Sequence, residues 1–322
     1  MPLYPLKFKS IFKYRIWGGE KLKTILNKKY SESSIGESWE LSDVPGDESL
    51  ISNGHFKGKT LNSLLKTYPN EILGTSVYKK HGIQFPLLLK FIDAKTPLSI
   101  QVHPNDELAK KRKNSLGKSE MWYVMESDNN AELIVGFKEK ETKETYAESI
   151  KTNKIVSLLN TVKVKKGDTF YIPAGRIHAI GSGVMLAEIQ QTSDITYRIY
   201  DYDRVDKKTN SKRALHTEES LDAIDFEVKE NYNSYYKKDI NKPNELVYSP
   251  YFKTDITFLK GELTKDYSKK DSFIIYMCVS GELMVTYNKK EYSLENGEVL
   301  LLPASINEVS LKGEAELIEV FM

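Results

Sequence analysis

Four side chains that could bind a metal ion stand in or beside stretches typical of β-strands: Gln101, His103, Glu120 and His178. Gln101 and His103 are separated by one residue, so on a strand their side chains point to the same face. An amide oxygen, two imidazoles and a carboxylate that meet inside a β-barrel would suit a borderline divalent ion such as zinc. The spacing alone leaves open the alternative that each histidine is an ordinary core or surface residue.

The elements that would position these side chains are short β segments. Glu120 opens the apolar run 121–125, and a Pro-Ala-Gly turn precedes His178 after the strand-like segment 169–172. Further strands are expected at residues 87–92, 98–102, 132–135 and 184–189, separated by Gly, Pro, Asn and Asp. Helices should be few and short: one capped by Thr60, a pair over residues 142–150 and 154–159, and one starting near Thr217. The chain is predicted to be mainly β, as a sandwich or barrel.

Composition describes an ordinary globular protein of 322 residues, with 47 basic and 45 acidic side chains and a net charge of +2. That balance gives no electrostatic case for binding nucleic acid or a membrane, and the basic cluster 110–113 is expected to be a solvated surface. The single cysteine, Cys278, excludes a disulfide within the chain and suits a reducing cytosol. The sequence shows no signal-peptide pattern and no apolar run long enough to span a bilayer, so a cytoplasmic location is expected.

Two domains are expected, residues 1–232 and 233–322, because the polar stretch 229–244 lacks periodicity and resembles a connection. An internal echo supports the division. Gly167-Asp168 is followed by Pro173-Ala174 and then His178, and Gly297-Glu298 is followed at the same spacing by Pro303-Ala304 and then Glu308. The second copy therefore has glutamate in place of the histidine, and we expect no metal site there.

Several motifs resemble those of the short bacterial form of the type I mannose-6-phosphate isomerases, which are members of the cupin superfamily. The most specific is Gln-x-His-Pro-Asn-Asp at residues 101–106, and the others lie at 17–19, 36–42, 117–123, 171–179 and 193–198. The resemblance implies a double cupin, two β-barrel or jelly-roll domains with a few short helices, whose N-terminal domain is catalytic. It also implies a zinc-dependent enzyme that interconverts mannose 6-phosphate and fructose 6-phosphate through an enediol.

Residue by residue, the resemblance implies that one zinc ion per chain is held by Gln101, His103, Glu120 and His178. It implies catalytic roles for Arg198 and Lys118 and contacts from Ser99, Lys118 and Arg198 to a small sugar phosphate. From the residues alone, Arg198 could equally form an ion pair with Asp194 or Asp201, Lys118 could be solvated, and the hydroxyl of Ser99 could bond to a neighbouring strand.

The chain departs from the family pattern in two places. Some members have a histidine directly before the motif lysine, where this chain has Gly117. Long members also insert a helical domain for which this chain has no room. The group that moves the proton is left open, with a zinc-bound water, Glu40, Asp194 and Lys118 as candidates.

Two other functions remain open at this stage. One is a different metal-dependent cupin enzyme of the dioxygenase type, although such sites favour more histidine than is present here. The other is a cupin that binds a sugar phosphate without catalysis. The sequence does not determine the oligomeric state.

Overall fold

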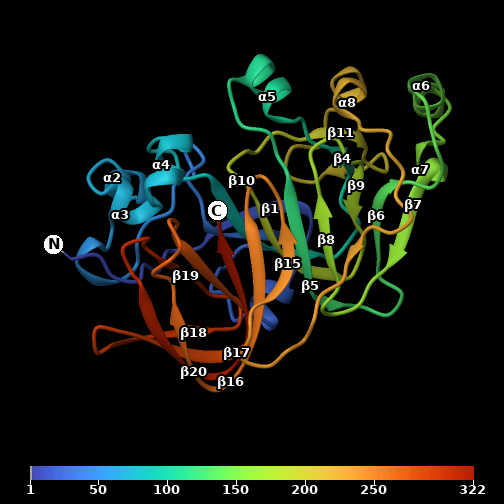
Figure 1. The fold of residues 1–322 in the computed structure, drawn as a ribbon. Coiled ribbons are helices and arrows are strands. Elements are labelled where there is room, and N and C mark those ends of the chain that lie inside the picture. The colour runs from blue at the N-terminus through green and yellow to red at the C-terminus, as the bar shows by residue number, and fades with distance from the viewer. Residues whose placement is uncertain (1) are drawn as a thin grey trace.

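The computed structural model describes residues 2–322, and it confirms a mainly β chain with a few short helices (Figure 1). The first 234 residues contribute two facing sheets. The larger has seven strands in the order β1 (Ile11–Gly19), β2 (Ile35–Leu41), β3 (Leu87–Ala94), β10 (Val184–Gln191), β5 (Glu120–Ser127), β8 (Thr169–Ile172) and β14 (Asn233–Ser234). The smaller has the order β11 (Tyr197–Tyr200), β4 (Ile100–Val102), β9 (His178–Ile180), β6 (Glu132–Phe137) and β7 (Leu159–Lys163).

The central strands of the larger sheet are buried on both faces, and alternation along each strand divides its side chains between two cores. On β3, Leu89 and Phe91 enter a core that also contains residues of the C-terminal domain, whereas Ile92 faces the smaller sheet. Lys90 and, on the neighbouring β10, Glu188 lie on the face that meets the smaller sheet and line a cavity there. The fold therefore places charged side chains inside the N-terminal domain.

The C-terminal domain is one curved sheet in the order β15 (Asn244–Tyr248), β16 (Lys253–Asp266), β20 (Glu308–Phe321), β17 (Ile274–Tyr287) and β18 (Lys290–Glu295), with β19 (Val299–Leu302) paired to β17. The internal echo is visible in the backbone. Gly167 precedes β8 and Gly297 precedes β19, with φ of 89° and 87°, a conformation that glycine adopts without strain. His178 opens the strand after the first copy, and Glu308 opens the strand after the second.

Part of the stretch that was expected to connect the domains forms a short strand of the larger sheet. Asn233 and Ser234 form β14 and pair with Phe170 and Thr169 of β8, so these residues extend the larger sheet. The first strand of the C-terminal sheet begins at Asn244.

Four short helices lie where the sequence predicted them: α2 (Leu61–Leu65), α6 (Lys143–Lys151), α7 (Ile155–Leu158) and α8 (Thr217–Ala223). Thr60 caps α2 by accepting a bond from Ser63 N at 3.1 Å, as expected. The cap of α8 is His216, one residue before the predicted start. No helix within residues 2–322 is both long and apolar enough to cross a bilayer.

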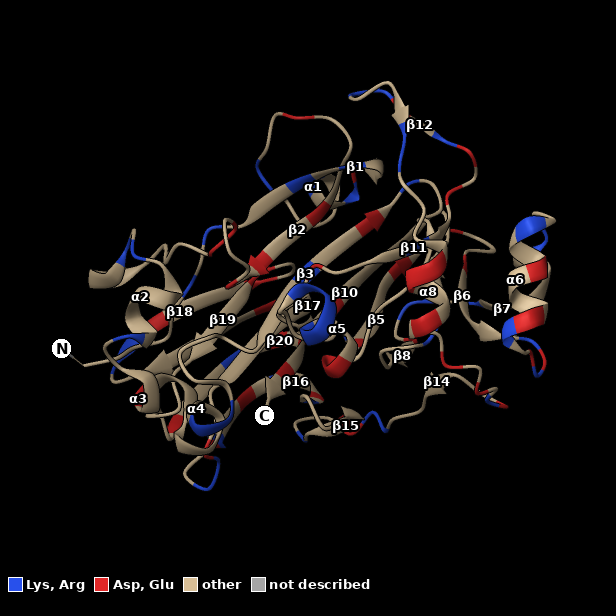
Figure 2. Ribbon diagram, turned by 90° about the horizontal axis from the view of Figure 1, so that it is seen from above, with Lys and Arg blue, Asp and Glu red and all other residues tan. Residues whose placement is uncertain are grey.

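Other helices were not predicted: α1 (Lys21–Thr24), α3 (Pro69–Leu73), α4 (Thr75–His81), α5 (Asp106–Lys113) and a 3₁₀ turn at Gly54–Phe56. In α5 the basic cluster 110–113 is mostly exposed, as predicted, and Figure 2 shows it in blue. Arg112 forms an ion pair with Asp222 of the acidic α8. Only Ala109 of α5 is buried, so the helix lacks the apolar periodicity that would reveal it.

Candidate active site

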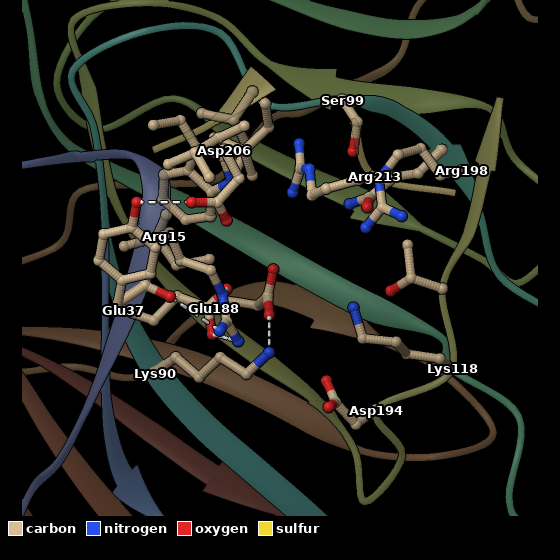
Figure 3. Close-up of a pocket in the computed structure, with 18 of the residues that line it drawn as sticks. Arg15, Glu37, Lys90, Ser99, Lys118, Glu188, Asp194, Arg198, Asp206 and Arg213 are labelled. Atoms are coloured by element: carbon tan, nitrogen blue, oxygen red, sulfur yellow. Dashed lines mark hydrogen bonds and ion pairs between the residues drawn. The ribbon is translucent and has the colours of Figure 1, made fainter. Parts of the chain in front are cut away.

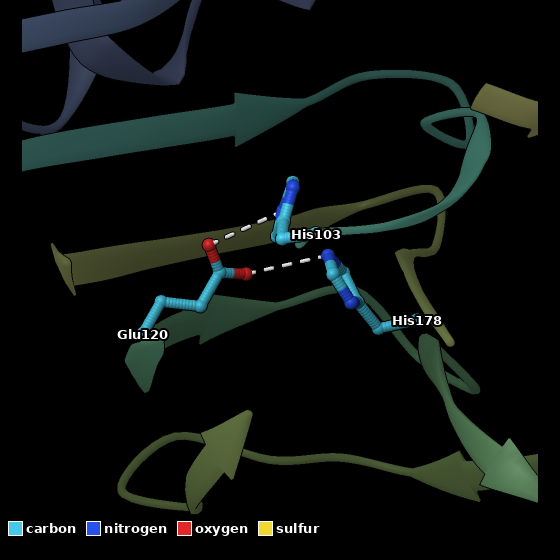
Figure 4. Close-up of side chains that lie close together, drawn as sticks. All are labelled: His103, Glu120 and His178. Carbon is cyan, nitrogen blue, oxygen red and sulfur yellow. Dashed lines mark ion pairs between the residues drawn. The ribbon is translucent and has the colours of Figure 1, made fainter. Parts of the chain in front are cut away.

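Three of the four predicted ligands converge between the two sheets: His103 directly after β4, Glu120 at the start of β5 and His178 at the start of β9 (Figure 4). All three are buried, and their ligand atoms lie within 4.8 Å of one another. The Nε2 of His103 is 3.5 Å from Glu120 Oε2, and the Nε2 of His178 is 3.4 Å from Glu120 Oε1. This is a cluster that could hold a metal ion.

Backbone carbonyls fix the orientation of both imidazoles, because each carbonyl binds the ring nitrogen that faces away from Glu120. His103 Nδ1 donates to the carbonyl of Ile195 at 2.9 Å, and His178 Nδ1 donates to the carbonyl of Arg176 at 2.8 Å. Burial lowers the pKa of His103 well below its usual value, and it lowers the pKa of His178 to about 3. Both rings are therefore neutral, with the lone pair of Nε2 directed at the shared centre, the form in which histidine binds metals.

Gln101 lies at the same centre because β4 pairs with β9 in the register that sets Gln101 opposite His178. Its amide nitrogen is 3.2 Å from His178 Nε2. Rotating this amide by 180° exchanges its oxygen and nitrogen, which would direct the oxygen, the atom that binds metals, to the centre.

The donor set fits a divalent cation. Glu120 Oε1 is buried and has no hydrogen-bond partner within residues 2–322, an acceptor that a bound ion would satisfy. Lys118 already directs its ammonium at the set, 2.6 Å from Glu120 Oε2 and 3.0 Å from His103 Nε2. Two neutral imidazoles, one carboxylate and one amide match the ligands that zinc and similar ions take.

Gln101 and Lys118, which lie against the cluster, also line a cavity of about 390 Å³ between the sheets (Figure 3). Five residues named from the sequence line it: Ser99, Gln101, Lys118, Asp194 and Arg198. Charged residues that the sequence analysis missed line it as well: Arg15, Glu37, Lys90, Glu188 and Arg213.

The missed residues at one end of the cavity form two ion pairs, of which Lys90–Glu188 is buried on both sides and Arg15–Glu37 is partly exposed at the arginine. Arg15 binds Glu37 with two nitrogens, at 2.8 and 2.9 Å, and Lys90 lies 3.1 Å from Glu188. Burial alone would raise the pKa of Glu37, but Arg15 and Lys90 hold it well below its usual value. Burial would likewise lower the pKa of Lys90, yet Glu188 and Glu37 raise it to about 12. Both pairs are charged near neutral pH and form a fixed polar wall.

Arg198 lies on the opposite wall and is half-buried. Its Nη1 donates to the carbonyl of Ala214 at 2.9 Å, and its Nε has no partner within residues 2–322. The predicted alternative, an ion pair with Asp201, does not form, because Asp201 binds Arg204 and Arg213 instead. Burial and the nearby Arg213 lower the pKa of Arg198 to about 10, which leaves it charged at neutral pH.

The structure separates the candidates for the proton carrier. Glu40 lies outside the cavity lining, where it accepts from Lys28 at 2.7 Å and from Ser10 at 2.8 Å. Asp194 and Lys118 both line the cavity. Glu308, the residue that echoes His178, is exposed on β20 in the other domain.

Comparison with known proteins gives concordant results over the whole chain. The family "Phosphomannose isomerase type I, catalytic domain" matches residues 5–149, and "Mannose-6-phosphate isomerase, cupin domain" matches residues 242–322. Mannose-6-phosphate isomerase ManA of Bacillus subtilis is 36% identical over 321 residues, covering 99% of each chain. Mannose-6-phosphate isomerase of Streptococcus mutans is 35% identical over 317 residues, covering 98% of this chain and 97% of that protein.

A solved structure agrees with these relatives. The crystal structure of mannose 6-phosphate isomerase from Bacillus subtilis superposes with a TM-score of 0.90 at 32% identity and covers 99% of each chain. The match to the cupin-domain family agrees with the predicted cupin fold of the C-terminal sheet. With full-length relatives above 30% identity, a matching fold and a buried metal-ligand cluster at the predicted residues, this chain belongs to the type I mannose-6-phosphate isomerase family.

Proposed function

We propose that the chain is a zinc-dependent aldose–ketose isomerase that interconverts mannose 6-phosphate and fructose 6-phosphate through an enediol. The observation that carries the proposal is the buried His103–Glu120–His178 cluster at the edge of a cavity lined by cationic side chains. The names of the full-length relatives support the choice of substrate.

Gln101, His103, Glu120 and His178 would hold one zinc ion per chain. When bound, the ion would polarise the sugar carbonyl and stabilise negative charge on its oxygen. Because glutamine is a neutral ligand, the set of one carboxylate, two imidazoles and one amide would leave a net charge of +1 and so preserve the strength of the Lewis acid.

The remaining roles belong to side chains of the cavity. Arg198 is a cation at neutral pH that lines the cavity, suited to an enediolate oxygen or a phosphate. Lys118 could donate to substrate oxygens, and Ser99 offers a hydroxyl to the phosphate. Isomerisation needs a base that moves a proton between C1 and C2, and Asp194 and Lys118 are the cavity-lining side chains among the candidates named from the sequence.

We further propose that residues 1–232 carry the catalytic site and that residues 233–322 are a cupin-like domain without a metal site. The three-residue His/Glu cluster lies wholly in the first part, which supports this division. The single cysteine, buried at position 278, supports a reducing cytosol as the working compartment.

The test is a coupled assay that follows conversion of mannose 6-phosphate, on protein as purified, after chelation and after zinc is restored. We expect turnover that disappears on chelation and returns with zinc. A zinc-loaded protein without turnover would overturn the proposal, and oxygen uptake by such a protein would indicate the dioxygenase type of cupin instead.

A further inference from the structure

A hairpin between β11 and α8 forms one wall of the cavity. The chain leaves β11, forms β12 (Val205–Asp206) and β13 (Ser211–Lys212), and returns at residues 213–216. The returning arm is bonded to Arg198: the backbone N–H of Arg198 donates to His216 Nδ1 at 3.1 Å, and the N–H of His216 donates to the carbonyl of Arg198 at 2.8 Å. These bonds hold Arg213 beside Arg198.

Positive charge exceeds negative charge at this wall. The buried carboxylate of Asp201 accepts from Arg213 Nε at 2.8 Å and Nη2 at 2.6 Å, and it also accepts from Arg204. With Arg198, three guanidinium groups therefore gather around one carboxylate. Arg198 and Arg213 line the cavity, whereas Arg204 lies outside the lining and donates to the carbonyl of Pro97.

Donors at this wall remain available to a ligand. Within residues 2–322, Arg213 Nη1, Arg198 Nη2 and the hydroxyl of Ser99 form no hydrogen bond with the protein. Ser99 precedes the ligand Gln101 by two residues, a rise of about 7 Å along a strand. Figure 3 shows Ser99, Arg198 and Arg213 grouped at one end of the cavity.

The acids that line the cavity do not neutralise this wall. Glu37 and Glu188 pair with Arg15 and Lys90 at the other end. Asp206 lies on the hairpin itself and accepts from the neutral hydroxyl of Tyr14 at 3.0 Å, but the three guanidinium groups still exceed the two carboxylates of Asp201 and Asp206. The carboxylate of Asp194 interacts with the charged groups of Arg15 and Lys90 and raises the pKa of each. Two guanidinium groups and a hydroxyl thus present donors for a compact dianion, because charged N–H groups form the stronger hydrogen bonds to phosphate oxygens.

We propose that Arg213 is a specificity residue that, together with Arg198 and Ser99, binds the phosphoryl group and selects phosphorylated over unphosphorylated sugars. The proposal rests on the isomerase function proposed above. Asp201 positions Arg213, because it holds two of the three guanidinium nitrogens and leaves Nη1 for the substrate.

The test compares Arg213→Ala with the wild-type enzyme, both zinc-loaded, on mannose 6-phosphate and on mannose. We expect kcat/KM for mannose 6-phosphate to fall on the order of 30-fold, the range of a hydrogen bond to a charged group, with kcat/KM for mannose little changed. Arg213→Lys keeps the positive charge but lacks the planar guanidinium with its several N–H donors, so its kcat/KM for mannose 6-phosphate should fall less than that of Arg213→Ala.

Arg204→Ala is the matched control, since Arg204 binds the same carboxylate from outside the cavity. It should retain the discrimination between the two sugars. An equal loss in Arg204→Ala would assign the effect to the structure of the hairpin and overturn the specificity role of Arg213. Zinc content and the far-ultraviolet circular dichroism spectrum are compared for every variant.

A second measurement does not depend on turnover. Titration of the zinc-loaded proteins with inorganic phosphate, followed by calorimetry, should show a Kd weaker by a similar factor in Arg213→Ala and near wild type in Arg204→Ala. If the protein isomerises neither sugar, the proposed function is wrong, but the phosphate titration still tests whether Arg213 binds a phosphoryl group. An unchanged phosphate Kd in Arg213→Ala would overturn the proposal.

Discussion

The ammonium of Lys118 lies 2.6 Å from Glu120 Oε2, two residues along the chain, and both groups are buried. Lys118 Nζ also lies 3.0 Å from His103 Nε2. A cation is thus already in contact with two of the proposed ligands. Lys118 also lines the cavity, so its flexible side chain could point there once a metal ion takes its place beside Glu120.

Removing a ligand should empty the metal site. We expect His103→Ala or His178→Ala to lose stoichiometric zinc and nearly all isomerase activity, since each supplies an imidazole whose Nε2 is directed at the centre. Metal content per chain by elemental analysis measures this. Glu308→Ala, at the echoing position in the other domain, should keep both zinc and activity, and loss of zinc there would contradict a single site.

Arg198 should act on the rate rather than only on binding. If its guanidinium, besides holding the phosphoryl group, also faces the enediolate oxygen, Arg198→Ala should lose roughly 3–4 kcal/mol of transition-state stabilisation, which lowers kcat on the order of a few hundred-fold. Steady-state kinetics at saturating substrate, with zinc content verified, measures it. A near-normal kcat with a raised KM would leave Arg198 only a role in holding phosphate.

Ser99 and Lys118 should show the opposite pattern. As proposed contacts to the substrate, Ser99 and Lys118 should mainly affect KM when replaced by alanine, because a contact made equally in the ground and transition states leaves kcat unchanged. The same steady-state assay decides this. A large fall in kcat for Lys118→Ala at full zinc occupancy would favour Lys118 as the proton carrier instead.

Lys90 should be important for stability. Lys90→Met leaves Glu188 without its buried partner, so we expect the free energy of unfolding to fall by about 3 kcal/mol, measured by urea denaturation. The double variant Lys90→Met/Glu188→Gln removes the uncompensated charge and should recover part of this loss. Because Glu188 and Glu37 raise the pKa of Lys90 from 10.5 to about 12, the ion-pair contribution is fully present below pH 10.5 and disappears as the pH rises through 12.

Asp271 links the two domains through a helix cap. Its carboxylate accepts from the backbone N–H groups of Thr75 and Ser76 at 2.6 and 2.8 Å, at the start of α4. Asp271→Ala should therefore lower the free energy of unfolding by about 1 kcal/mol. Glu262→Ala, which breaks the exposed ion pair with Lys312, is the control and should leave the free energy of unfolding nearly unchanged. An equal loss of stability in Asp271→Ala and Glu262→Ala would contradict a specific contribution from the helix cap.

The sequence was sufficient where local pattern determines structure. Strands such as 184–189 are apolar at all but one position, and the hydroxyl of Thr60 accepts from the backbone as expected. Thr142, where the second helix was predicted to begin, caps α6 in the same way. The cluster His103, Glu120 and His178 was predicted because its residue types are rare and its motifs are specific.

The sequence was insufficient where tertiary register determines which side chains meet. Lys90 and Glu188 each interrupt an apolar strand, and this was the signal in the sequence that they face a polar cavity. The antiparallel register of β3 and β10 sets the two side chains opposite each other, and the local sequence does not encode that register. Arg213 lies in a polar segment, and its place beside Arg198 depends on the return of the hairpin. Glu37 and Arg15 meet only through the pairing of β1 with β2.

The core that contains Leu89 and Phe91 together with Ile256 and Ile318 belongs to both domains at once. A chain cut after residue 232 would expose this apolar face of the sheet whose other face carries the site. Such a fragment should aggregate, and the full chain should lose both halves in a single cooperative transition on heating. The C-terminal sheet, although it has no metal cluster within the described residues, would then stabilise the larger sheet of the other domain by covering its apolar face.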